Sequence, residues 1–473
     1  MRNNKEEIEL SQEKQSGSVE FYGGEKMVFV PILLALVGLF YIALQNANIP
    51  EYWVVFLLPL IIMMPLARDK EEYSRAIVRG FSSEVAMILI GAVMLAGISG
   101  AILSHSGVVN TLASYLVSFN LVGAKYVVAT FLLTCIIAFS TGTSVGTIFV
   151  VGPILYPAGY LVGAAPAFLI GAIVSGGAFG DNLSPVSDTT IASATTQEVD
   201  LGGVVKSRLK YSLPAAGITL LLYAIFSGSG EVAQGAKEYM QQPEPITLWF
   251  LLIPAVIVYF CLRQRHLIEA LSYGVLTGLI VGLLTGIVSP GDIISVPEQF
   301  GAGGIILEGL QDSIPTVIVV LILFAQINVL EEGGGINQIM NFMSRFVRGV
   351  KSAEASIAAL LITLNLATGL NTAAIVGTGE IARKLGKEYQ IDGYRRANLM
   401  DCAGTTFNYL LPYMVPVVVG SMISSMHAPV EDAIQVSPLQ VVTHQFYPWV
   451  MLGILIFAIV SGYGRTFISD ARA

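Results

Sequence analysis

The stretch GAFGDNLSPVSDTT, residues 177–190, places two aspartates inside a long apolar part of the chain. Between Tyr126 and Gln197 the chain has no other Asp, Glu, Lys, Arg or His. The glycines weaken a helix through their backbone freedom, and the proline removes a backbone donor. The stretch therefore predicts a broken helix that carries two carboxylates in apolar surroundings.

The composition indicates where such a helix lies. The chain has 473 residues, of which 54% are hydrophobic and 12% charged, and its mean hydropathy is +0.71. Soluble domains have roughly 25% charged residues. Many apolar runs approach the ~20 residues that a membrane-spanning helix needs. The clearest predicted spans are 27–44, 52–67, 85–103, 126–139, 211–226, 246–262, 267–288, 316–330 and 446–460. The sequence predicts an all-α polytopic membrane protein with about 11–13 transmembrane helices.

The same pattern divides the chain into five segments. These are a polar cytoplasmic tail (1–26), a first transmembrane half with the ion-site motif (27–210), connecting transmembrane helices (211–304), a second, inverted repeat (305–426), and a last loop, transmembrane helix and cytoplasmic tail (427–473).

The basic residues predict the orientation of the chain in the membrane. With a cytoplasmic N-terminus, all of the 25 Lys and Arg residues except Lys125 and Lys237 fall in cytoplasmic segments. Arg208, Arg395 and Arg396 are counted among these loop charges. Such a bias follows the positive-inside rule. We therefore expect a multi-pass protein of the cytoplasmic membrane with both termini in the cytoplasm.

A weak internal repeat occurs at an offset of 227 residues. Gly177 falls on Gly404 (404 − 177 = 227) and Pro185 on Pro412 (412 − 185 = 227). Residues 156–169 have no charge, whereas their counterparts at 383–396 have five Lys or Arg. The two copies therefore read as inverted in the membrane, each with broken or re-entrant helices. Inverted repeats of this kind are typical of secondary transporters, which bind substrates where the breaks meet.

Side-chain oxygens gather at the predicted breaks. A charged residue at the centre of a span usually faces a wet, functional interior, and hard cations prefer oxygen ligands. The candidate ion- or substrate-binding residues are Asp181, Asn182, Ser184, Ser187, Asp188, Thr189, Thr141, Thr143, Ser144, Asn371, Thr372, Asp401, Thr405 and Asn408. Asp181 and Asp188 are the predicted sodium ligands. A proton that neutralises the carboxylate when the metal ion leaves would produce antiport without a separate proton site.

Several of these residues also have a structural interpretation. Asp188 could cap the helix that begins at Thr189. Asp401 could be a third intramembrane acid, or could pair with Arg395 or Arg396 at the interface. Glu380 lies beside basic residues, so we expect it to be paired or solvated. The hydroxyls at 141–147 could bond to carbonyls one turn back.

Three motifs resemble the NhaC family of sodium/proton antiporters, within the ion transporter superfamily. They are GTSVGT at 142–147, GPILYP at 152–157 and SGGAFGDNLSPVSDTT at 175–190, and a looser similarity continues through RRANLMD at 395–401. The resemblance implies electrochemically driven exchange of sodium for protons, with Asp181, Ser184, Ser187, Asp188 and Thr189 at the site. Val145 stands where many members carry Trp, and Asn371 and Asn408 leave the second copy short of acids.

The predicted function is therefore sodium/proton exchange at intramembrane aspartates. The alternative is a sodium- or proton-coupled transporter or exchanger of a small organic acid or amino acid, because residues 371–392 look more like those branches of the family. We expect no enzymatic activity and no cofactor, with Na⁺ and H⁺ as transported or coupling ions. The expected partner is the lipid bilayer, not nucleic acid, and a homo-oligomer is compatible with the sequence.

Overall fold

The computed structural model describes residues 19–44, 49–228, 243–263, 265–295, 302–335, 338, 349–368, 371–427 and 434–468. Most of the predicted N-terminal tail, 1–18, lies outside these residues. Within the described part of the chain the structure is helical, and its only β interactions are three isolated bridges. The predicted all-α class is confirmed.

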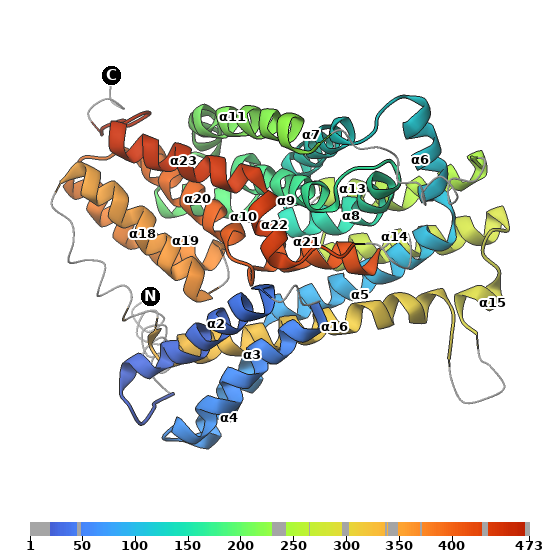
Figure 1. The fold of residues 1–473 in the computed structure, drawn as a ribbon. Coiled ribbons are helices and arrows are strands. Elements are labelled where there is room, and N and C mark those ends of the chain that lie inside the picture. The colour runs from blue at the N-terminus through green and yellow to red at the C-terminus, as the bar shows by residue number, and fades with distance from the viewer. Residues whose placement is uncertain are drawn as a thin grey trace.

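Figure 1 shows the described helices and their order along the chain. The first half contains η1 (Glu25–Phe29), α2 (Val30–Leu44), α3 (Ile49–Met63), η2 (Met64–Leu66), α4 (Lys70–Phe81), α5 (Glu84–His105), α6 (Val108–Ser118), α7 (Ala124–Thr141), α8 (Ser144–Leu161), α9 (Pro166–Leu183), α10 (Asp188–Thr196) and α11 (Leu201–Phe226). The second half contains η3 (Pro245–Leu251), α13 (Leu252–Leu262), α14 (Leu267–Thr285), α15 (Pro290–Ile293), α16 (Ile305–Glu332), α18 (Val350–Thr368), α19 (Asn371–Glu388), α20 (Gly393–Leu410), α21 (Val415–Met426), α22 (Pro438–His444) and α23 (Phe446–Ser461).

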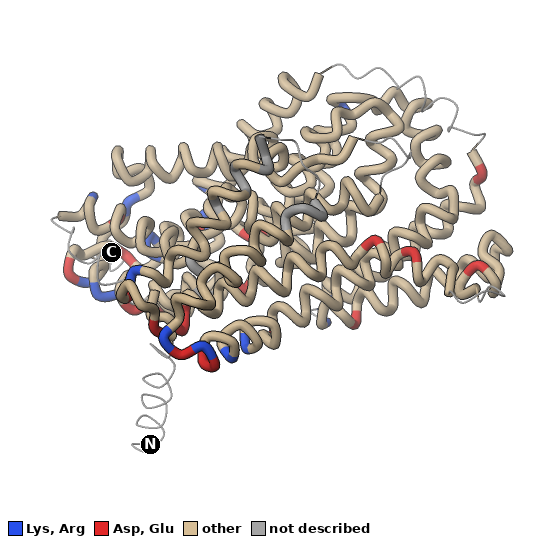
Figure 2. The backbone as a smooth tube through the Cα atoms, turned by 60° about the horizontal axis from the view of Figure 1, so that its bottom comes forward, with Lys and Arg blue, Asp and Glu red and all other residues tan. Residues whose placement is uncertain are grey.

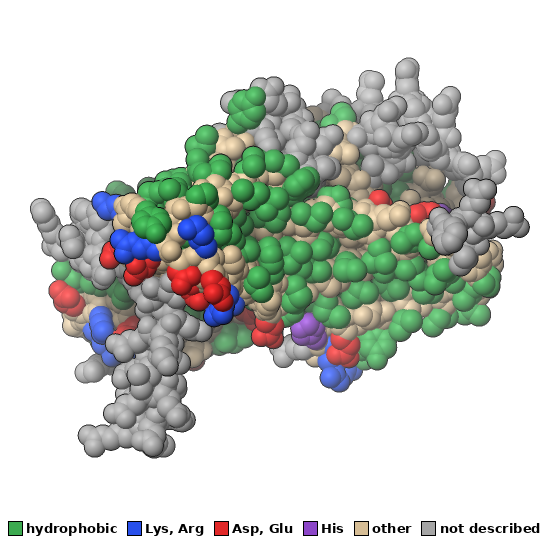
Figure 3. Space-filling view, turned by 90° about the horizontal axis from the view of Figure 1, so that it is seen from below, with side chains coloured by type: hydrophobic (Ala, Val, Ile, Leu, Met, Phe, Trp, Pro, Cys, Tyr) green, Lys and Arg blue, Asp and Glu red, His purple; other side chains and the backbone are tan. Residues whose placement is uncertain are grey.

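Nine spans in the described residues are long and apolar enough to cross a membrane, or ten if α22 and α23, bent by 53°, form one span. The sequence predicts about 11–13 such helices. The predicted spans 27–44 and 52–67 correspond to α2 and α3, which have only 15 residues each. Apolar side chains cover the face of the molecule seen in Figure 3. The chain is a polytopic helical membrane protein.

The offset of the sequence repeat also appears in the helix boundaries. Helices α8 and α19 begin 227 residues apart (371 − 144) and end 227 apart (388 − 161). The same holds for α9 and α20 (393 − 166 and 410 − 183). The break 184–187 after α9 therefore corresponds to the break 411–414 after α20. The two halves have matching broken helices, and their inversion in the membrane stays a prediction.

The charged residues gather mainly at one end of the bundle, and few lie between the ends (Figure 2). Helices α2 to α5 and α16 lie along one side of the molecule in Figure 1, and α16 also contacts α18 and α21. Of the predicted polar residues, Asp181, Asn182, Ser184, Ser187, Thr189, Ser144, Asn371, Asp401, Thr405 and Asn408 are buried within the bundle.

Candidate functional site

Two of the predicted breaks touch each other. Gly142 ends α7 in the left-handed conformation, with φ of 70°. A Cβ atom at Gly142 would lie 2.7 Å from the backbone carbonyl of Val186, in the break after α9. Thr143 then caps α8 by accepting a hydrogen bond from the backbone of Gly146, at 3.3 Å. Only glycine fits this contact, and it brings the start of α8 against the end of α9.

The contact between the breaks brings Ser144 to Asp181. Asp181 lies in the last turn of α9 and is 9% exposed. Its Oδ2 atom accepts hydrogen bonds from Ser144 Oγ, at 2.7 Å, and from the hydroxyl of Tyr409, at 2.9 Å. Ser144 belongs to the first half of the chain and Tyr409 to the second. Both halves therefore hold this carboxylate with neutral donors.

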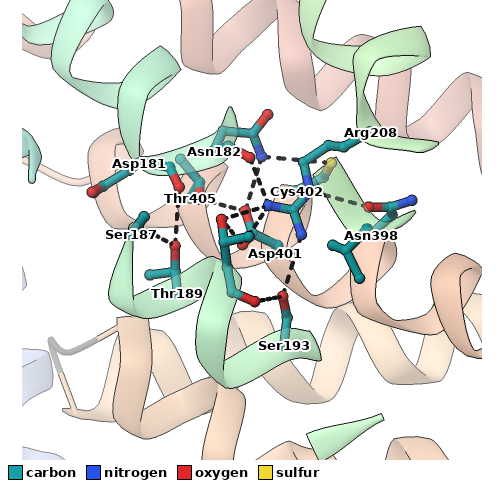
Figure 4. Close-up of polar contacts among 12 residues, drawn as sticks. Asp181, Asn182, Ser187, Thr189, Ser193, Arg208, Asn398, Asp401, Cys402 and Thr405 are labelled. Carbon is teal, nitrogen blue, oxygen red and sulfur yellow. Dashed lines mark hydrogen bonds and ion pairs between the residues drawn. The ribbon is translucent and has the colours of Figure 1, made fainter. Parts of the chain in front are cut away.

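The main chain beside Asp181 is fixed by the start of the next helix. Thr189 donates a 3.0 Å hydrogen bond to the backbone carbonyl of Asp181, and its hydroxyl lies 2.9 Å from that of Ser187 (Figure 4). Ser184 is buried, and its hydroxyl accepts from the backbone of Val186 at 3.3 Å. These bonds close the break from 184 to 187 around the Asp181 carbonyl.

The neighbouring Asn182 joins the two halves a second time. Its amide nitrogen donates to Asp401 Oδ1 on α20, at 3.0 Å. Its amide oxygen accepts from Ser212 Oγ, at 2.5 Å, and from the hydroxyl of Tyr447, at 3.0 Å. Both amide atoms of Asn182 are therefore engaged in hydrogen bonds between helices, and its oxygen is not available to bind an ion.

Asp401 is paired with Arg208, whose Nη1 lies 2.9 Å from Asp401 Oδ2, and both side chains are 0% exposed (Figure 4). Arg208 also donates to the Asn182 carbonyl at 2.7 Å, to Thr190 Oγ1 at 2.8 Å and to Asn398 Oδ1 at 3.1 Å. A buried charge is tolerated only when it is paired and hydrogen-bonded in this way. The expected alternative pairing of Asp401 with Arg395 or Arg396 is therefore wrong.

Arg208, Arg395 and Arg396, which the sequence assigns to cytoplasmic loops, are all buried. Arg395 forms a two-bond pair with Glu354, at 2.9 and 3.0 Å, and Arg396 donates to Gln197 Oε1 at 2.8 Å. The loop assignment was wrong for Arg208, Arg395 and Arg396, because each lies within a helix that continues into the membrane domain. Counting basic residues does not distinguish a loop from the buried end of a long helix.

The other predicted residues of the first half are dispersed. Asp188 is exposed at the first position of α10, and no hydrogen bond or ion pair joins it to Asp181 in the described part of the chain. Thr141 Oγ1 lies 3.0 Å from Thr147 Oγ1, which itself bonds to the Thr143 carbonyl at 2.7 Å. These hydroxyls therefore form the local bonds that were the alternative to ligation.

Two of the predicted residues of the second half, Asn371 and Thr405, are linked to Asp401 by hydrogen bonds. Asn371 donates to Thr405 Oγ1 at 3.5 Å, and Thr405 donates to Asp401 Oδ1 at 3.3 Å. Asn408 is buried, and its amide oxygen has no hydrogen-bond partner. Thr372 is half-buried. Glu380 is exposed, and its Oε1 atom lies 2.7 Å from Lys384 Nζ, which agrees with the prediction that it is paired with a basic residue.

The residues of the polar centre that are missing from the sequence prediction include Tyr409, Tyr447, Ser212 and Arg208. The repeat gave a usable signal for one of them, because Tyr409 occupies the position of Asn182 in the other copy (409 − 182 = 227). No spacing marks the other three, because α11 and α23 approach the site only through tertiary packing.

An enclosed centre of hydrogen-bonded polar side chains inside a bundle of membrane-length helices is typical of transport proteins. The Na⁺/H⁺ antiporter family matches the chain over residues 17–227 and 245–462, and the chain belongs to this family. The predicted family is confirmed.

Relatives with different substrates cover much of the chain. It is 24% identical over 428 residues to the Na⁺/H⁺ antiporter NhaC of Bacillus subtilis, covering 86% of this chain and 92% of that protein. It is 30% identical over 252 residues to the malate-2H⁺/Na⁺-lactate antiporter of B. subtilis, covering 51% and 52%. It is 26% identical over 352 residues to the arginine/ornithine antiporter ArcD of Halobacterium salinarum, covering 69% and 72%. These relatives are transporters, and the chain is an antiporter rather than an enzyme.

Proposed function

We propose that the protein exchanges sodium ions for protons across the cytoplasmic membrane and that the two ions compete for Asp181. One observation carries this proposal. Asp181 is buried between the two halves and no basic side chain contacts it in the described part of the chain, whereas the fully buried Asp401 is neutralised by Arg208. An ionised carboxylate without a counter-ion is costly in such a place, so Asp181 takes up a cation or a proton.

The hydroxyls of Ser144 and Tyr409 have a role in both the sodium-bound and the protonated state of Asp181. Ser144 and Tyr409 both reach Oδ2, which leaves the other carboxylate oxygen without a side-chain donor in the described residues. A sodium ion bound there would find oxygen ligands only, as hard cations prefer. Binding either Na⁺ or H⁺ leaves Asp181 neutral, so the site exchanges one ion for the other without a change of its net charge.

The remaining predicted residues support this exchange in different ways. Thr189 and Ser187 hold the backbone carbonyl at the break, and Ser184 closes the same turn. Asp188 is exposed, and we assign it to the path by which the hydrated cation reaches Asp181. A carboxylate on such a path raises the local concentration of cations.

We further propose that both termini lie in the cytoplasm. The distribution of Lys and Arg along the sequence supports this orientation, and most charged residues of the described chain gather at one end of the bundle (Figure 2). The positive-inside rule places such an end in the cytoplasm.

The test uses purified protein in liposomes that contain a pH-sensitive dye, with an imposed proton gradient and no organic solute. Sodium, lithium and potassium are added in turn to the wild type and to Asp181→Asn. We expect sodium to dissipate the gradient in the wild type and to have no effect on Asp181→Asn. Asp69→Asn is the matched control, because the exposed Asp69 caps helix α4 and Asn caps a helix equally well. An Asp181→Asn protein that exchanges sodium normally would refute the role of Asp181.

A second function is favoured by the relatives that exchange organic solutes. In this alternative the protein carries a small organic acid or amino acid, and its acids bind only the coupling ion. The same liposomes distinguish the two. If sodium dissipates the gradient only after malate, lactate, arginine or ornithine is added, the organic solute is the substrate and sodium/proton exchange alone is refuted.

A further inference from the structure

Three asparagines of the second half have buried amide oxygens with no hydrogen-bond partner among the described residues. They are Asn365 on α18, Asn371 on α19 and Asn408 on α20, with exposed fractions of 0%, 6% and 8%. Buried acceptors are almost always satisfied in proteins, because an unmade hydrogen bond leaves the cost of desolvation uncompensated. Three such oxygens on the neighbouring helices α18, α19 and α20 therefore mark a candidate site for a donor or a cation.

Two of these side chains, Asn365 and Asn371, lie against Gly404, and Asn408 follows one turn further along the same helix. Asn365 donates its amide N–H to the Gly404 carbonyl at 2.7 Å. A Cβ atom at Gly404 would lie 2.0 Å from Asn371 Oδ1, so this oxygen lies directly against the glycine. Asn408 lies four residues further along α20, on the same face of the helix. The absence of a side chain at Gly404 thus makes room for the amide oxygen of Asn371. Helices α18, α19 and α20 each contribute one asparagine to this region.

Existing hydrogen bonds fix which amide atoms remain available. Asn365 uses its nitrogen toward the Gly404 carbonyl. Thr405 donates its hydroxyl proton to Asp401, so it accepts from the nitrogen of Asn371. The oxygens of both asparagines are therefore the atoms left over. A ligand for them must be a donor or a cation.

This place corresponds to the Asp181 site in the other half. Asn371 matches Ser144 (371 − 144 = 227), Gly404 matches Gly177 (404 − 177 = 227) and Asn408 matches Asp181 (408 − 181 = 227). In the first half these positions bring a hydroxyl against a carboxylate. In the second half the positions that match Ser144 and Asp181 are both asparagines, whose amides do not take up protons near neutral pH.

We infer that Asn365, Asn371 and Asn408 bind a second sodium ion, in a site built from neutral oxygens. This inference rests on the proposed sodium exchange and deepens it. Because no ligand in the second site is an acid, a proton cannot replace its ion directly. The second ion is therefore bound independently of pH, while the ion at Asp181 competes with protons.

The test measures the thermal unfolding midpoint of the purified full chain in detergent as NaCl replaces choline chloride at constant ionic strength. A ligand that binds only the folded state raises this midpoint. The Asp181→Asn variant removes the acid site, so any remaining shift reports the second site. We expect a shift of equal size at pH 6 and pH 8.5.

Two further variants on the Asp181→Asn background locate the second site. Asn371→Leu should abolish the remaining sodium-dependent shift. Thr378→Val is the matched control and should keep it, because Thr378 is also a buried, unpartnered polar residue of α19 but lies about 10 Å along the helix. Loss of all sodium dependence in Asp181→Asn alone would overturn the second site and leave the role of Asp181 intact.

Asn408→Asp, on the same background, covers the case in which Asn371→Leu does not fold. It restores an acid at the position that matches Asp181 and is nearly isosteric. The sodium-dependent shift should then become larger at pH 8.5 than at pH 6. A shift that stays independent of pH would refute the participation of Asn408. The proposed exchange is tested separately by transport in liposomes, so failure of one proposal is distinguishable from failure of the other.

Discussion

The hydroxyl of Tyr409 lies 2.9 Å from Asp181 Oδ2 and donates a hydrogen bond to it, although the two residues are 228 positions apart. Asn182, the neighbour of Asp181, donates in the opposite direction, from the first half to Asp401 in the second. In the repeat, Tyr409 and Asn182 occupy equivalent positions (409 − 182 = 227). Each half therefore donates a hydrogen bond to the acid of the other half. A sodium ion or proton that binds Asp181 consequently changes contacts of both halves.

Tyr409→Phe should weaken sodium binding at Asp181. The substitution keeps the ring and removes only the donor, and a hydrogen bond to a charged group contributes about 1.5–3 kcal/mol. We expect the sodium concentration for half-maximal exchange to rise about tenfold or more at constant pH. The measurement is dye-based exchange in liposomes at several sodium concentrations.

The control for this substitution is Tyr413→Phe. The hydroxyl of Tyr413 donates to the backbone carbonyl of Leu366 at 3.2 Å, outside the Asp181 site. Its loss should leave the half-maximal sodium concentration within a factor of two. Equal effects of the two substitutions would show that the hydroxyl of Tyr409 acts on stability and not on the ion.

Arg208→Met should strongly destabilise the protein, because it leaves Asp401 charged and buried. Removal of one partner of a buried ion pair costs about 3–5 kcal/mol. The double variant Arg208→Met with Asp401→Asn removes both charges and should recover most of the loss in thermal midpoint in detergent. If the double variant is no more stable than Arg208→Met, the ion pair is not the reason for the loss.

Much of the fold was predictable because it depends on local patterns. Apolar run lengths predict the membrane helices, and Gly and Pro predict the breaks at 184–187. The offset of 227 predicts which helices correspond, since α8 and α19 share their boundaries at this offset. These features are encoded within single segments, so the sequence alone reveals them.

The polar centre was only partly predictable, because its partners come from distant helices. Asp181 and Ser144 stand out as polar residues in apolar surroundings. Arg208 does not, because a basic residue near the end of a predicted span looks like a loop charge. Its burial depends on how α11 packs against α20, and Asp401 gives no sign in the sequence of which arginine it meets. Tertiary packing decides such pairs.

The hydrogen bond between Tyr394 and Asp200 makes the free energy of unfolding depend on pH. Asp200 lies between two spans and caps α11, and the hydroxyl of Tyr394 and the backbone N–H of Gly203 hold the pKa of this carboxyl below its usual value. A group with a lowered pKa in the folded state stabilises the protein above its unfolded pKa of about 3.9, and this contribution is lost as the pH falls through the folded pKa.

We therefore expect the thermal midpoint of the wild type to fall more steeply below about pH 4 than that of Tyr394→Phe. The measurement is the thermal midpoint in detergent between about pH 3 and pH 6. Parallel curves for the two proteins would show that the bond to Tyr394 does not contribute to this pH dependence.

Gly142→Ala should separate the two breaks that form the site. The added Cβ would lie 2.7 Å from the backbone of Val186, and the positive φ of 70° at this position already disfavours alanine by roughly 1 kcal/mol. Because the clash is with backbone, it can be relieved only if the start of α8 moves away from the end of α9. Ser144 then loses its 2.7 Å contact with Asp181, and sodium-dependent exchange in liposomes should fall by tenfold or more.

Gly217→Ala on α11 is the matched control, since an added Cβ there meets nothing within 4 Å, and a helical alanine is more favourable than glycine. It should retain full exchange with an equal or higher thermal midpoint. If Gly142→Ala also exchanged sodium normally, contact between the two breaks would not be needed for transport.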